Sequence, residues 1–133
     1  MTQFVPALED AGHGDLASSV ARIEDFVRRW WADNPMPWFT DHGPDHSLRV
    51  AHYATQIADV PALPPDLQLS ALERYILWAS AWLHDLGMQS LLGRPLGPIT
   101  PEHQAEIRHQ HPDETAAVIL ERAPLIGLPA DAR

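Results

Sequence analysis

The segment that decides the fold is Asp66–Leu86, DLQLSALERYILWASAWLHDL, the most apolar part of the chain. Its apolar residues recur at steps of three and four, and polar side chains occupy a narrow edge at Gln68, Glu73 and Arg74. This pattern predicts a long, central and largely buried helix. Gly87 follows the segment, and we expect it to end the helix in a left-handed conformation.

The same three-and-four spacing recurs on both sides of this segment. It predicts further helices over residues 16–33, 45–58, 100–109 and 112–123. No window shows the alternation of a strand, so the predicted fold class is all-α, a single bundle of five to six helices over residues 15–133. Residues 1–14 show no sustained period and are expected to form an N-terminal arm that ends at a capping Asp15.

Composition narrows the possible functions. The chain of 133 residues fits one domain, and 18 acidic against 9 basic side chains give a formal charge of −9, which argues against a nucleic-acid partner. Because the chain has no Cys, any metal must be held by His, carboxylate or carbonyl groups. No apolar run approaches a membrane span, and Met1-Thr2-Gln3-Phe4 lacks a basic signal-peptide start, so we expect a cytoplasmic protein without a membrane partner.

Eight histidines are the unusual feature of the chain. The doublet His84-Asp85 lies at the end of the apolar segment, where a buried His and Asp each need a partner. One such partner is a divalent metal ion, and the other is a set of backbone groups at the helix end. His46 belongs to the first turn of a predicted helix and is expected to project into the same core. With His42 and His111 also available, the donors form a mixed nitrogen and oxygen set suited to Mn, Fe, Ni, Zn or Mg.

The order of these residues resembles a known family. His46-Ser47-x-Arg49-Val50, followed by His84-Asp85-Leu86-Gly87, is similar to the HD-domain superfamily of metal-dependent phosphohydrolases. Phe39-Thr40-Asp41-His42-Gly43 and Arg108-x-x-His111-Pro112-x-x-Thr115-Ala116 resemble the branch with HD-GYP-type phosphodiesterases and HD domains fused to ATPase modules. The likeness spans about residues 38–120.

The resemblance implies a role for each of these side chains. His46, His84 and Asp85 would bind a divalent ion, Asp85 would also bridge to a second ion, and His111 would ligate that ion or contact phosphate. Asp85 and His111 are thus the predicted catalytic residues, and His111 is a predicted metal ligand. The candidate substrate-binding residues are His42, Arg49 and Arg108. His42 is equally well read as an ordinary loop residue, and Arg49 as a salt-bridge partner of a core carboxylate. The remaining His residues near these motifs are expected at the surface, namely His52, His103 and His109, although His109 is able to exchange roles with His111.

The implied activity is hydrolysis of a nucleotide or small phosphoester through metal-bound hydroxide. The alternative is a non-catalytic, metal- or nucleotide-binding regulatory HD module coupled to a partner domain. Members of the family complete the site with a later Asp, whereas here residues 127–131 resemble the first turn of a further helix. We therefore expect a domain that lacks its C-terminal part, with homodimerisation or docking to a further domain. Gly87-Met88 offers no cation, which argues against cyclic dinucleotide cleavage.

Overall fold

The computed structural model describes residues 4–33, 40–60, 62–91, 94–95 and 100–128. These residues contain five α-helices. They are α1 (Val5–Asp10), α2 (Gly14–Trp30), α3 (Pro44–Ala58), α4 (Ala71–Leu83) and α5 (Pro101–Ile126). Two short 3₁₀ helices, η1 (Pro65–Leu67) and η2 (Leu86–Gln89), flank α4, and a two-residue antiparallel pair joins β1 (Ser90–Leu91) to β2 (Arg94–Pro95). The all-α prediction is confirmed. None of these helices combines the length and apolarity that a bilayer crossing requires, within the residues described.

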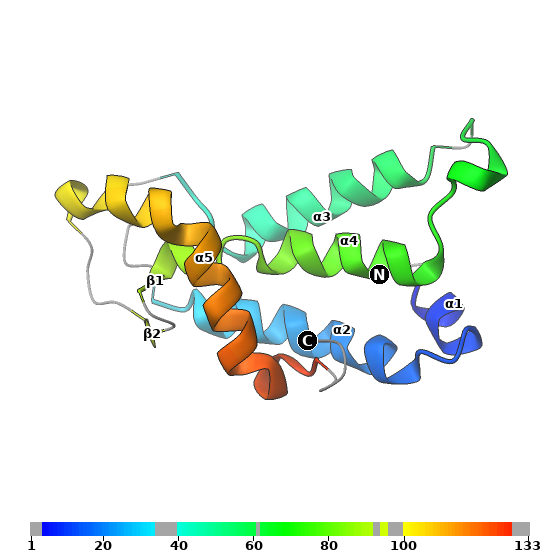
Figure 1. Cartoon of the computed structure of the whole chain (residues 1–133), viewed down its shortest axis with the longest axis horizontal. Helices are drawn as coiled ribbons and strands as arrows, with labels where there is room; N and C mark the ends of the chain where they lie inside the picture. Colours follow the sequence, from blue (N-terminus) through cyan, green and yellow to red (C-terminus); the bar gives the residue numbers. More distant parts are fainter. Residues whose placement is uncertain (1–3, 34–39, 61, 92–93, 96–99, 129–133) are drawn as a thin grey trace.

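The central helix is α4, as the apolar segment predicts. It lies between α3 and α2 and runs antiparallel to α3, while α5 crosses the end of the bundle where α4 stops (Figure 1). The core is built from all five helices and from η2. Its largest fully buried apolar side chains are Leu8, Ile23, Val27, Trp82, Leu86, Met88, Ile107, Val118 and Ile126.

The start of α4 differs from the sequence prediction. The helix begins after Ser70 rather than at Asp66, because the Ser70 hydroxyl accepts from the Glu73 backbone N–H at 3.2 Å and the Glu73 carboxylate accepts from the Ser70 N–H at 2.8 Å. This reciprocal pair satisfies two exposed donors of the first turn. Gly87 also differs from the prediction, because it does not adopt the left-handed conformation. Among the described residues, the glycines with positive φ are Gly12 and Gly127.

A single helix, α5, replaces the two helices predicted over residues 100–123. Pro112 lies inside it and cannot donate to the carbonyl of Arg108. The helix bends partway along its length without stopping (Figure 1). We therefore correct the predicted break: one proline kinks this helix and does not terminate it.

The two ends of the chain also correct the sequence analysis. Residues 4–10 are not a loose arm, because α1 packs onto the bundle and Phe4 and Leu8 are buried. At the other end, Gly127 does not open a new helix. It caps α5 with φ +83°, and its N–H and that of Leu128 both donate to Ala123 at 3.0 Å. Residues 129–133, including the predicted helical turn around Asp131, lie outside the described residues.

Candidate metal centre

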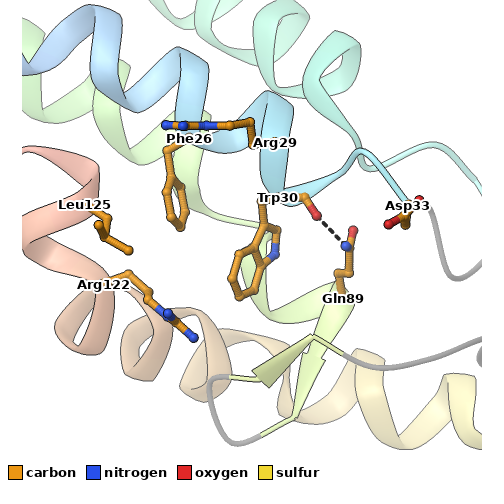
Figure 2. A pocket seen from close by; sticks show the side chains of 7 residues that line it. All are labelled: Phe26, Arg29, Trp30, Asp33, Gln89, Arg122 and Leu125. Carbon is orange, nitrogen blue, oxygen red and sulfur yellow. Dashed lines mark hydrogen bonds between the residues drawn. The ribbon is translucent and has the colours of Figure 1, made fainter.

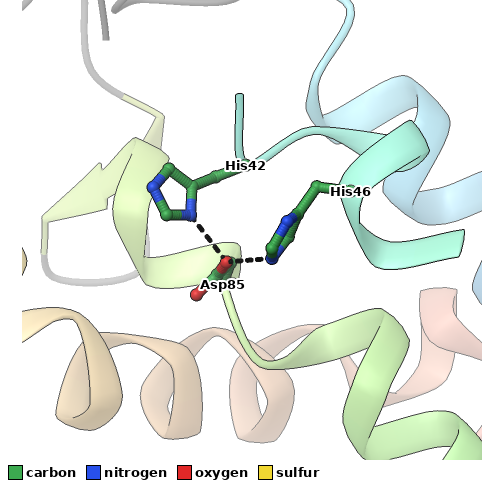
Figure 3. A group of neighbouring side chains, drawn as sticks. All are labelled: His42, His46 and Asp85. Atoms are coloured by element: carbon green, nitrogen blue, oxygen red, sulfur yellow. Dashed lines mark hydrogen bonds and ion pairs between the residues drawn. The ribbon is translucent and has the colours of Figure 1, made fainter. Parts of the chain in front are cut away.

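The candidate site is built around the carboxylate of Asp85, whose side chain is only 7% exposed. Its Oδ2 lies 2.8 Å from Nδ1 of His42, 2.9 Å from Nε2 of His84 and 3.3 Å from Nε2 of His46. Its Oδ1 faces Nε2 of His111 at 3.7 Å. His42 and His46 converge on the same carboxylate oxygen (Figure 3). A buried anion is therefore surrounded by imidazole nitrogens.

Three separate segments bring these groups together. Pro44 starts α3, which sets His46 in its first turn, and His42 precedes that turn. His84 is the C-terminal cap of α4, and Asp85 follows it directly. His111 lies in α5, which crosses at the end of α4 (Figure 1). The site therefore exists only once the bundle is assembled.

The backbone fixes which nitrogen of two histidines faces the carboxylate. Nδ1 of His84 lies 2.8 Å from the carbonyl of Ala81, and Nδ1 of His111 lies 2.7 Å from the carbonyl of Arg108. A carbonyl only accepts, so each Nδ1 carries the proton and donates. In the neutral imidazole, Nε2 then keeps its lone pair for a metal ion, whereas in the imidazolium form of His84 it carries the proton that is donated to Asp85. This second-nitrogen bond is the arrangement that orients metal-binding histidines.

Thr115 joins η2 and the end of α4 to α5. Its hydroxyl accepts from the Gly87 N–H at 2.9 Å and donates to the His84 carbonyl at 2.9 Å. Gly87 is tightly packed here, because a Cβ built on it would lie 2.2 Å from the carbonyl oxygen of His111. The close approach explains why glycine occupies this position, and it holds His111 beside the His84-Asp85 doublet.

Burial and hydrogen bonding shift the pKa values in this cluster. Burial acts to raise the pKa of Asp85, but hydrogen bonds from His84 and His42 outweigh it and lower the pKa to about 2. The hydrogen bond to Asp85 raises the pKa of His84. Burial instead lowers the pKa of His46, against the attraction of Asp85. Asp85 is therefore ionised throughout the physiological range, and His46 favours the neutral form that ligates metals.

These shifts predict how the stability of the metal-free protein depends on pH. The lowered pKa of Asp85 stabilises the folded state above pH 3.8, the ordinary pKa of an Asp side chain. This contribution is lost as the pH falls toward about 2. At about 1.4 kcal/mol per pH unit, that contribution is about 2 kcal/mol. The raised pKa of His84 contributes stability that is complete below 6.5 and is lost as pH rises through its folded-state pKa.

We expect urea unfolding in the presence of a chelator to show that the wild type loses unfolding free energy at acid pH. The difference in unfolding free energy between wild type and Asp85→Asn should shrink by about 2 kcal/mol between about pH 5 and about pH 2. A constant difference over that range would contradict the assignment.

The structure brings most of the predicted site residues together. His46, His84, Asp85 and His111 converge, and His42 joins them, although the sequence analysis placed it on the substrate side or in an ordinary loop. His84 meets the backbone with Nδ1 and Asp85 with Nε2, so the backbone reading of the doublet holds for His84, and the metal reading stays a prediction. The histidines predicted at the surface are exposed, namely His52, His103 and His109.

The predicted substrate-binding arginines are outside this cluster. Arg49 is exposed and lies 3.8 Å from the carboxylate of Asp41, which is not a core carboxylate because it is itself about half exposed. Arg108 is exposed, and its backbone carbonyl, not its guanidinium, bonds to His111. Thr115 is the residue to which sequence reasoning gave no role. Its signal was its place four residues after His111, which puts both on one face of a helix.

The donor set fits a divalent ion. The ligand atoms of His42, His46 and Asp85 all lie within 4.8 Å of one another, and Nε2 of His84 lies 3.4 Å from Nε2 of His46 and 2.9 Å from Oδ2 of Asp85. Ligands of one ion sit about 2.0–2.3 Å from it, so their atoms are separated by up to about twice that distance. Neutral imidazole and carboxylate donors suit borderline transition metals such as Zn, Fe, Ni and Mn.

An all-α bundle that carries a His-Asp doublet at the end of its central helix, with a further histidine from the preceding helix, is an HD-type domain. Comparison with protein-family models agrees, because the model named HD-CE matches residues 36–133. The chain belongs to the HD-CE family. Searches of curated proteins and of solved structures found no significant match. The likeness to the HD-GYP-type and ATPase-fused branch stays a prediction.

Proposed function

We propose that the chain is a metal-dependent phosphohydrolase that acts on a nucleotide or another small phosphoester. The observation that carries the proposal is the buried Asp85 carboxylate, faced by nitrogens of four histidines. Membership of the HD-CE family supports it.

In this proposal His46, His84 and Asp85 hold a divalent ion. The ion, when bound, supplies Lewis-acid activation of water and of the phosphoryl group. Asp85 presents two oxygens to different sides of the site, Oδ2 toward His42, His46 and His84, and Oδ1 toward His111. This division suits a carboxylate that also serves a second ion on the side of His111.

The remaining side chains would bind and orient the substrate. Nδ1 of His42 donates to Oδ2 of Asp85, because a carboxylate only accepts, and this bond fixes the direction of the carboxylate. Arg49 and Arg108 are exposed guanidinium groups on α3 and α5, the two helices that also carry His46 and His111. Guanidinium groups bind phosphate with two parallel hydrogen bonds, so we propose that these arginines receive the phosphate of the substrate.

The test is metal content together with turnover of bis(p-nitrophenyl) phosphate in added Mn. We expect protein purified without chelator to carry a divalent metal, p-nitrophenol release to stop with EDTA, and His84→Ala to lose both metal and turnover. His52→Ala is the matched control, because His52 is an exposed histidine of α3 outside the cluster. Equal metal content in His84→Ala and the wild type would show that this site does not bind the metal.

One observation favours the regulatory alternative. A cavity of about 580 Å³ beside His84 is lined almost entirely by apolar side chains of α2, α4 and α5, including Leu72, Ile76 and Ile119. Ile76 is 54% exposed. An apolar surface of this kind is typical of a face that docks to a partner domain. Stoichiometric metal without any phosphodiester turnover would favour this function over hydrolysis.

A further inference from the structure

A second cavity lies outside the histidine cluster. It has a volume of about 460 Å³ and is formed by the C-terminal turns of α2, the end of η2 and the last turns of α5. Figure 2 shows the residues around this space, which are Phe26, Arg29 and Trp30 on α2, Asp33 after it, Gln89 at the end of η2, and Arg122 and Leu125 on α5. Its size is that of a site for a small organic molecule.

One wall of the cavity is aromatic and held in place. The rings of Phe26 and Trp30 stack with centroids 5.6 Å apart and an interplanar angle of 24°. The indole N–H of Trp30 donates to the carbonyl of Leu86 at 3.1 Å, which fixes the ring against η2. Phe26 supports one face of the fixed indole, and planar ligands bind the open face of such a ring by stacking.

The other walls contain buried polar atoms without a partner. Gln89 is 3% exposed, its amide N–H donates to the backbone carbonyl of Trp30, and its Oε1 has no hydrogen-bond partner among the described residues. Nε of Arg122 is likewise buried and has no hydrogen-bond partner among the described residues. The Arg122 guanidinium lies 3.7 Å from the carboxylate of Glu121, which is half exposed. An unpaired buried polar atom costs about 1–3 kcal/mol. A ligand that supplies one donor and one anionic acceptor would remove both costs once the two side chains turn these atoms toward the cavity.

We propose that this cavity binds a nucleoside monophosphate. The base would stack against Phe26 and Trp30, a base N–H would donate to Oε1 of Gln89, and the phosphate would pair with the guanidinium of Arg122. A simple aromatic ring lacks the donor and the anion, and a sugar phosphate lacks the planar face. This binding does not depend on the proposed hydrolase activity, because none of these residues belongs to the metal centre.

The test is isothermal titration calorimetry of the whole chain in EDTA with AMP, GMP, CMP and UMP. We expect at least one of them to bind saturably, and its nucleoside and ribose 5-phosphate to bind about tenfold more weakly or worse. Arg122→Met keeps the apolar stem of the side chain and should weaken binding about tenfold, as should Gln89→Leu. Arg28→Met, an exposed arginine of α2 that does not line the cavity, should bind like the wild type.

Several outcomes would overturn the proposal. They are the absence of saturable binding by all four nucleotides, unchanged binding in Arg122→Met, and binding of ribose 5-phosphate as tight as that of the nucleotide. Loss of binding in Asp85→Asn with retention in Arg122→Met would place the nucleotide at the metal centre and would also contradict it. Circular dichroism melts verify that each variant is folded, and if Gln89→Leu does not fold, Arg122→Met decides.

Discussion

Replacing Asp85 with Asn is expected to abolish metal binding and to lower phosphodiester turnover by about a thousandfold, which corresponds to about 4 kcal/mol. Asn has nearly the same shape, so the packing around it is kept while the negative charge is lost. Asp85 faces nitrogens of all four histidines of the site, whereas each histidine provides one nitrogen to it. The loss should therefore exceed that of any single His→Ala variant. Elemental analysis and p-nitrophenol release measure the two effects.

The matched control is Asp66→Asn, an exposed carboxylate of η1. It should keep wild-type metal content and turnover. Retention of both properties in Asp85→Asn would contradict the assignment of the site. Far-UV circular dichroism separates loss of the site from loss of the helical fold.

Replacing Gly87 with Ala is expected to have the second-largest effect. The added Cβ would lie 2.2 Å from the carbonyl oxygen of His111 and 2.7 Å from the backbone nitrogen of Thr115. Both atoms belong to the backbone of α5, so η2 and α5 must move apart. Overpacking of this kind costs about 1–3 kcal/mol. The same movement would separate His111 from Asp85, so metal affinity should fall together with the free energy of unfolding.

Gly14→Ala provides a control of the same chemistry. Gly14 begins α2, and a Cβ built on it meets nothing within 4 Å. Urea unfolding should give Gly14→Ala a stability equal to or above that of the wild type, because alanine favours a helix. If the two substitutions changed the unfolding free energy equally, the close approach at Gly87 would not be the cause.

Much of the fold follows from local signals. The range predicted for α3 agrees almost to the residue, and Pro44 in its first turn is a signal that acts within one helix. The start of α4 is also encoded locally, since Ser70 and Glu73 have the spacing of a capping box. The short α1 carries too few turns to show a period, and its helix depends on burying Phe4 and Leu8 against the bundle.

The error at Gly87 has a tertiary origin. A glycine after a helix is often left-handed, but Gly87 is required because α5 approaches it closely, and no local pattern reveals a contact with a segment so distant in the chain. His42 lies in a segment without helical periodicity, so the spacing of residues could not predict that its ring faces Asp85. The doublet, by contrast, was identifiable because a buried His and Asp each need a partner and because its order with His46 and His111 resembles the HD-domain superfamily.

The pairing of His111 with Pro112 has a consequence beyond this site. In a regular helix, the residue at position 112 would donate its N–H to the Arg108 carbonyl four residues earlier. Proline has no N–H, so that acceptor is open, and it lies three residues before His111, whose Nδ1 takes it. The dipeptide therefore encodes a histidine tautomer: any His-Pro within a continuous helix has a vacant carbonyl below the imidazole. A residue known for ending helices can thus fix, where the helix continues through it, which imidazole nitrogen of its neighbour donates to the backbone.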